Sequence, residues 1–121
     1  MNEEIKGQWL SALRSGEYLQ GTGKLNDGEG HYCCLGVLTD LAVKAGVCEW
    51  TPKADGILMS VADPDGYLES GVLSEKVAEW AGMPGNVVGR MILEGGERWL
   101  TTLNDDGMTF SEIADLIERE F

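Results

Sequence analysis

The chain has 121 residues, of which 21 are acidic and nine are basic, so its formal net charge is −12. This length favours a single domain over residues 1–121, and a hydrophobic fraction of 43% is that of a globular protein rather than a disordered chain. The acidic charge argues against direct binding of nucleic acid or of an anionic membrane, because both need clustered lysine and arginine. No stretch has the length of a membrane span, and we expect no secretory signal.

Hydrophobic spacing and turn residues predict an α+β fold with four to five short helices and two or three small antiparallel β pieces. The expected helices cover residues 3–14, 33–45, 74–81, 99–103 and 110–120. The expected strands cover residues 18–25 with a turn at 26–28 and a return through 31–33, residues 57–61 with a return at 67–68, and residues 87–93.

The clearest helix signals lie in the second and the last helical segments. Residues 33–45 are almost wholly apolar, which predicts a core helix with Asp40 and Lys44 paired on its polar side. Thr109 and Glu112 have the spacing of a capping box, in which each side chain bonds the backbone amide of the other residue. Both helices are expected to turn an apolar face toward the core.

The acidic surplus lies mainly in the second half of the chain. Residues 1–54 carry five basic and seven acidic side chains, whereas residues 55–121 carry four basic and fourteen acidic ones. An uneven charge distribution affects which partners a protein surface attracts, but it does not determine the fold. The second half is therefore expected to repel an anionic ligand and to attract a basic protein.

Three cysteines and one histidine give little support for metal or redox chemistry. Cys33, Cys34 and Cys48 form an odd set with two adjacent members, which is a poor disulfide framework and fits a reducing cytosol. His31 and Cys33 lie on one side of an expected strand, so a thiol and a base are within reach of each other. The apolar run that follows them favours buried core thiols instead.

Acidic residues also suggest calcium binding or acid–base catalysis, but their spacing argues against both. The turns at 63–66 and 104–107 lack the spacing of a calcium loop and are expected to be ordinary Asx-type turns. With 21 acidic residues, chance pairs are common, and none has the features of a catalytic pair. We therefore expect no catalytic set, no metal and no cofactor.

A glycine-rich segment is the best candidate for a ligand site. Residues 16–30 contain five glycines, and Gly21 with Lys24 would bring backbone amides and a cation to an anion. Flanking and more distant side chains are expected to add donors and stacking rings: Arg14, Tyr18, Gln20, Trp50, Arg98 and Asn104. The competing interpretation is a glycine-bent hairpin packed on the first helix.

The four tryptophans divide between core and surface. Trp9, Trp80 and Trp99 lie on apolar faces of expected helices, so we expect them in the core. Trp50 precedes Pro52 in an expected loop and is the better candidate for an exposed contact.

Four segments of the chain form a recognisable set. They are WLSALRSGEY at 9–18 followed by Gln20 and Gly21, YCCLGVLTDL at 32–41, VAEWAGM at 77–83, and LNDDGMTFSEIADLI at 103–117. As a set they resemble a family of small proteins of tailed bacteriophages and prophages, in which a cysteine is common where this chain has Thr39. The resemblance implies an accessory protein in the cytoplasm of the infected bacterium, and such proteins often counter host defence.

Two functions follow as hypotheses, with an enzyme as a third. In the first, the protein binds and sequesters a small anionic, nucleotide-type signalling ligand at the glycine-rich segment, without chemistry. In the second, the acidic second half binds a basic host defence protein. The third is a small hydrolase, although no nucleophile, base and orienting group form a complete set. The odd cysteine count and the tryptophans leave a homodimer open.

Overall fold

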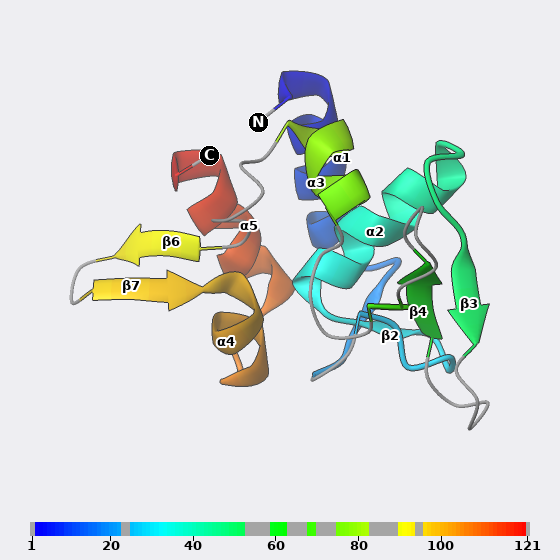
Figure 1. The fold of residues 1–121 in the computed structure, drawn as a ribbon. Coiled ribbons are helices and arrows are strands. Elements are labelled where there is room, and N and C mark those ends of the chain that lie inside the picture. The colour runs from blue at the N-terminus through cyan, green and yellow to red at the C-terminus, as the bar shows by residue number, and fades with distance from the viewer. Residues whose placement is uncertain are drawn as a thin grey trace.

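The computed structural model describes residues 2–22, 25–52, 59–62, 68–69, 75–82, 90–93 and 96–120. Within them the helices are α1 (Glu3–Ser15), α2 (Cys34–Lys44), α3 (Glu75–Ala81), α4 (Leu100–Asp105) and α5 (Phe110–Glu120). The strands are β1 (Leu19–Gln20), β2 (His31–Tyr32), β3 (Trp50–Pro52), β4 (Met59–Ala62), β5 (Leu68–Glu69), β6 (Arg90–Leu93) and β7 (Gly96–Trp99). The fold is α+β in one domain, as the hydrophobic spacing predicts (Figure 1).

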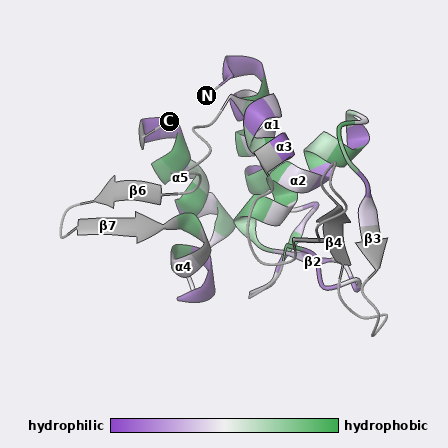
Figure 2. Ribbon diagram, viewed as in Figure 1, coloured by the Kyte–Doolittle hydropathy of each residue, from purple (hydrophilic) through white to green (hydrophobic). Residues whose placement is uncertain are grey.

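Helix α2 forms the centre of the core and contacts α1, α3 and α4. Buried residues occur on almost every face of α2. Figure 2 shows hydrophobic residues concentrated on α2 and α5. Helix α1 packs against both α2 and α5, and its Trp9 ring is fully buried. The indole Nε1 of Trp9 donates a hydrogen bond to the Cys34 carbonyl at 3.0 Å, so the core position predicted for this ring is confirmed.

Local sequence explains where α1 begins and ends. The side chain of Asn2 caps the helix by accepting hydrogen bonds from the amides of Glu4 and Ile5 at 3.0 and 3.1 Å. Gly16 ends the helix in the left-handed conformation, with a φ of 79° that favours glycine. The amide of Asn2 also donates to the Ala81 carbonyl at 2.8 Å, which attaches the start of α1 to the end of α3.

The last helix has the predicted capping box. Thr109 Oγ1 accepts a hydrogen bond from the Glu112 amide at 3.2 Å, and Glu112 Oε1 accepts one from the Thr109 amide at 3.2 Å. Phe110, Ile113 and Ile117 are buried on the face that meets the rest of the core. The prediction for residues 110–120 is therefore confirmed in its bounds, its cap and its apolar face.

The prediction of an antiparallel hairpin between residues 18 and 33 is wrong. Strands β1 and β2 are parallel, with Leu19 opposite His31. Leu25, which follows β1 in the sequence, is fully buried and its backbone lies against Gly36 of α2, so the connection between the strands is more than a tight turn. Parallel strands need a connection of this kind, since a tight turn joins only antiparallel ones. An isolated antiparallel bridge does form, between Asn26 and Tyr32.

The other two sheets are antiparallel, as predicted, but the loop expected at Trp50 is wrong, because Trp50–Pro52 forms β3 and pairs with β4. Strand β4 lies between β3 and β5, and β6 pairs with β7 in a hairpin that extends away from the helices (Figure 1). Strand β7 contains Trp99, which the sequence had suggested as the start of a helix; that helix begins one residue later, at Leu100. The expected turn at 63–66 and the expected strand residues 87–89 lie outside the described residues.

Candidate functional site

The residues predicted to bind a ligand do not form one pocket in the structure. Five of them surround the β1–β2 ladder and belong to two separate bonded groups: Tyr18, Gln20, Gly21, Trp50 and Asn104. Arg14 lies on another face, between α1 and α5. Lys24 lies outside the described residues, and Arg98 is placed in β7 by its backbone alone.

Gln20 is bonded entirely within the protein. Its Nε2 atom donates to Asn104 Oδ1 at 3.0 Å and to the Met108 carbonyl at 2.7 Å. Its Oε1 atom accepts a hydrogen bond from the Phe110 amide at 3.0 Å, which satisfies one of the free amides at the start of α5. Gln20 therefore joins β1 to the turn between α4 and α5, and a ligand at this amide would have to replace those bonds.

Asn104 completes the same network from the other side. It is buried, with 1% of its surface exposed. Besides bonding Gln20, its Oδ1 atom accepts from the Cys34 amide at 3.2 Å, and its Nδ2 atom donates to the Gly21 carbonyl at 2.8 Å. This single side chain thus connects α4, the start of α2 and the chain just after β1, which gives it a structural role.

Asp40 organises the second group of residues. Its carboxylate lies in α2 and is 9% exposed, so it needs hydrogen bonds to offset the loss of water. Oδ2 accepts from the Tyr18 hydroxyl at 2.6 Å, and Oδ1 accepts from Trp50 Nε1 at 2.9 Å. Lys44 Nζ lies 3.5 Å from Oδ2, which confirms the pairing predicted along α2. Asp40 therefore holds together two rings that are far apart in the sequence.

Three rings form what we call the aromatic cluster: Tyr18, Tyr32 and Trp50. The rings of Tyr18 and Tyr32 meet edge to face with centroids 5.0 Å apart, and Trp50 lies 6.3 Å from Tyr32. Lys44 Nζ donates to the Tyr18 hydroxyl at 3.1 Å, and burial raises the pKa of that hydroxyl. All three rings are half-buried, so Trp50 is less exposed than the sequence suggested.

Arg14 is held by carboxylates rather than being free for an anion. Its Nη2 atom lies 2.8 Å from Asp115 and 3.0 Å from Glu118, both on α5. These hydrogen bonds, that with Asp115 first, raise the pKa of the Arg14 guanidinium. The side chains of Asp115 and Glu118 are still 71% and 62% exposed, so this pair lies on the surface of the α1–α5 contact.

The histidine and the neighbouring thiols do not form a nucleophile and base. His31 Nδ1 lies 2.8 Å from Asp27 Oδ2, and backbone amides that bond Asp27, that of Glu29 first, lower the pKa of the Asp27 carboxyl. Cys33 and Cys34 are buried, and burial raises the pKa of both thiols. Raised values keep the sulfurs protonated and unreactive, so the interpretation as core thiols is confirmed.

Cys33 has a defined structural role at the start of α2. It is the N-cap residue, and its Sγ atom accepts a contact from the Gly36 amide at 3.4 Å. The Sγ atom of Cys34 approaches the Leu100 carbonyl at 3.6 Å. Both sulfurs thus serve packing and capping at the junction of α2 and α4.

Sequence reasoning missed the importance of Asp40 and Tyr32. Asp40 was placed on the polar face of the core helix, but it is buried and has two donors from outside its helix. The available signal was a lone carboxylate within the most apolar segment of the chain, since a buried charge requires partners. The partners themselves, Tyr18 and Trp50, are not identified by any local pattern.

Within the described residues, no group of three or more histidine, cysteine or acidic side chains is arranged to hold a metal ion. No described helix is long and apolar enough to cross a membrane. Each buried side-chain nitrogen or oxygen among the described residues has a hydrogen-bond partner. The polar groups near the β1–β2 ladder therefore stabilise the fold.

Fold and surface together define a small acidic α+β protein with an internally bonded polar core and exposed carboxylates on its helices. The chain belongs to the family described as Domain of unknown function (DUF8296), whose model matches residues 1–121. Comparison with curated proteins gives no match. Comparison with solved structures also gives none.

Proposed function

We propose that this protein is a phage accessory protein that counters host defence by binding a basic host protein in the bacterial cytoplasm, without chemistry of its own. The observation that carries the proposal is the surface of the last two helices. Residues 105–119 carry five exposed carboxylates and one cation of their own: Asp105, Asp106, Glu112, Asp115 and Glu118, with Arg119. Such a surface speeds association with a basic partner.

The internal bonding of the other candidate residues supports the same choice. A phosphate-bearing ligand favours arginine forks and free amide donors. Arg14 is held between two carboxylates, and Gln20 and Asn104 bond each other. Asp106 and Glu112, on the same surface, take part in none of these bonds, so a partner can dock on them without breaking any.

A charge-matched pair of variants tests this proposal. One variant combines Asp106→Asn, Asp115→Asn and Glu118→Gln; the control combines Glu3→Gln, Glu29→Gln and Glu79→Gln, at exposed positions elsewhere. Immobilised wild-type protein should retain a host protein that is released by salt. The first variant should associate with that protein roughly ten-fold more slowly, and the control should match the wild type. Equal retention by both variants would show that the acidic surface serves solubility alone.

An infection assay tests the defence component separately. Expression of the wild-type protein should raise the plating efficiency of a phage on a host that carries the relevant defence system. The first variant should lose that effect and the control should keep it. If both variants protect the phage equally, the acidic surface is not the means of protection.

A nucleotide-type ligand is the second candidate, and the aromatic cluster favours it. Tyr18 and Trp50 are held on one carboxylate with the exposed ammonium of Lys44 beside them, which would offer rings to a base and a cation to a phosphate. Cyclic nucleotides and ADP-ribose derivatives should then raise the melting temperature, and Lys44→Met should abolish the rise. Recovery of intact ligand would support sequestration, and recovery of altered ligand would support an enzyme.

A further inference from the structure

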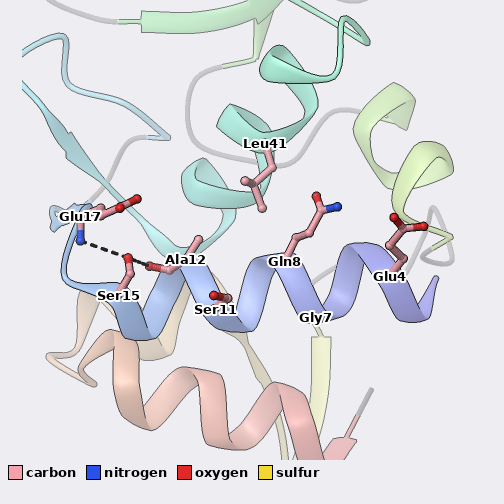
Figure 3. A pocket seen from close by; sticks show the side chains of 8 residues that line it. All are labelled: Glu4, Gly7, Gln8, Ser11, Ala12, Ser15, Glu17 and Leu41. Atoms are coloured by element: carbon pink, nitrogen blue, oxygen red, sulfur yellow. Dashed lines mark hydrogen bonds between the residues drawn. The ribbon is translucent and has the colours of Figure 1, made fainter.

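A groove with a volume of about 570 Å³ runs along α1 on the side that faces α2. Its lining comes from α1, from the residue after its cap and from α2: Glu4, Gly7, Gln8, Ser11, Ala12, Ser15, Glu17 and Leu41. Figure 3 shows Leu41 pointing from α2 toward α1, with Glu4 and Glu17 at opposite ends of the row. The groove is shallow and open to solvent along its length, so it suits an extended ligand rather than an enclosed one.

The charges of this groove have one sign. Glu4 and Glu17 are its charged lining residues, and both are exposed. Neither carboxylate forms an ion pair or a side-chain hydrogen bond with a described residue. From Glu4 to Ser15, the helix rises roughly 17 Å, so one metal ion cannot bridge both ends. A ligand that uses both carboxylates must be long and must carry positive charge at its two ends.

The middle of the groove suits a methylene chain. Ala12 and Leu41 are half-buried and provide apolar contact at one wall. Gly7 leaves the floor open, since a Cβ at this position would have no heavy atom within 4 Å. Gln8 and Ser11 are exposed and present oxygen atoms that accept hydrogen bonds from an N–H group.

We propose that this groove is a binding site for an aliphatic polyamine, whose terminal ammonium groups pair with Glu4 and Glu17. Its methylene chain lies along Ala12 and Leu41, as the stems of lysine side chains lie along apolar surface. Internal secondary ammonium groups donate to Gln8 and Ser11. This site is independent of the carboxylates on α5 and of the partner proposed above.

Titration of the ¹⁵N-labelled full-length protein with spermidine, followed by amide chemical shifts, tests the site. The chemical-shift changes should be largest at the amides of Gly7, Gln8 and Ser11. The amides of the acidic residues in α4 and α5 should change little. Spermine should bind more tightly than the shorter putrescine, and magnesium chloride at equal charge should not reproduce the pattern. Binding should weaken with added salt, since exposed ion pairs are screened.

Three substitutions separate the groove from general attraction to an acidic protein. Glu4→Gln and Glu17→Gln should each weaken spermidine binding about three-fold, and about ten-fold together. Glu3→Gln removes the same charge from the same helix turn outside the groove and should leave the affinity unchanged. Equal weakening by Glu3→Gln, or shifts spread over Asp105, Asp106 and Glu112, would overturn the proposal in favour of diffuse counterion attraction.

Discussion

Gln20 and Asn104 bond each other directly through their side-chain amides, with Gln20 Nε2 donating to Asn104 Oδ1 at 3.0 Å. Asn104 also holds the Cys34 amide and the Gly21 carbonyl. Replacement by alanine would leave these buried groups without partners, which costs more than the loss of an exposed hydrogen bond. We expect Asn104→Ala to lower the free energy of unfolding by about 2–3 kcal/mol, measured by urea denaturation.

Asp106 provides the matched control in the same turn, because it is exposed. Asp106→Ala should change stability by less than about 0.5 kcal/mol. A similar loss of unfolding free energy in both variants would mean that any substitution in this segment is destabilising. The hydrogen bonds of Asn104 would then not explain the effect.

Two helical glycines should respond to alanine in opposite directions. A Cβ at Gly36 would collide with the backbone carbonyl of Leu25, whereas a Cβ at Gly7 would meet open space. Alanine is favoured over glycine within a helix by about 1 kcal/mol. Gly7→Ala should therefore stabilise the protein by about 0.5–1 kcal/mol, while Gly36→Ala should destabilise it by about 2 kcal/mol or more because backbone atoms must move.

Thermal or urea unfolding of both glycine variants, under the same conditions, checks this prediction. Circular dichroism of the folded state shows whether α1 and α2 are retained. Stabilisation by Gly36→Ala would contradict the close approach of α2 to Leu25. Destabilisation by Gly7→Ala would show that the outer face of α1 is covered.

The hydroxyl groups of Tyr18 and Tyr32 have different surroundings and allow a paired test. The Tyr18 hydroxyl donates to Asp40 and accepts from Lys44, while that of Tyr32 has no hydrogen bond to a described residue. Tyr18→Phe should destabilise the protein by about 1–2 kcal/mol, because the buried carboxylate of Asp40 loses a donor. Tyr32→Phe should be close to neutral in the same urea titration, and equal effects would argue against a special role for Asp40.

Local patterns predicted the long helices well because each one carries its own signals. Helix α1 has an apolar face with Asn2 before it and Gly16 after it, and α5 has the box formed by Thr109 and Glu112. These features depend on residues within a few positions of each other. Spacing of 3.6 residues and capping side chains are therefore readable without knowledge of the fold.

Contacts between distant segments explain what the sequence did not reveal. The parallel pairing of β1 and β2 occurs together with the burial of Leu25 beside Gly36 of α2, a contact that local turn residues do not predict. The sequence suggests that Arg14 is free to bind an anion. Its carboxylate partners, Asp115 and Glu118, lie on α5, 101 and 104 positions further along the chain. Gln20 and Asn104, both candidate ligand contacts in the sequence, bond each other across 84 positions, and no local pattern predicts that bond.

The three thiols should differ in their reaction with iodoacetamide. Cys48 is partly exposed, whereas Cys33 and Cys34 are 2% and 0% exposed. Burial raises the pKa of all three, most strongly that of Cys34, and alkylation requires the thiolate. Mass spectrometry of the native protein near neutral pH should find Cys48 modified first, and Cys33 and Cys34 modified only as the protein unfolds.

The same pKa shift gives stability a defined dependence on pH. The thiol of Cys34 has a pKa well above 9.0 in the folded protein, while in the unfolded chain it ionises near 9.0. The unfolded state therefore loses its proton first, so the stability from this group is complete below pH 9.0 and falls as the pH rises further. Urea titrations across this range should show a decline that Cys34→Ala reduces more than Cys48→Ala does, because the pKa of Cys34 is raised further. An unchanged decline in Cys34→Ala would assign it to other groups, and rapid alkylation of native Cys34 would show that α2 is open to solvent at its start.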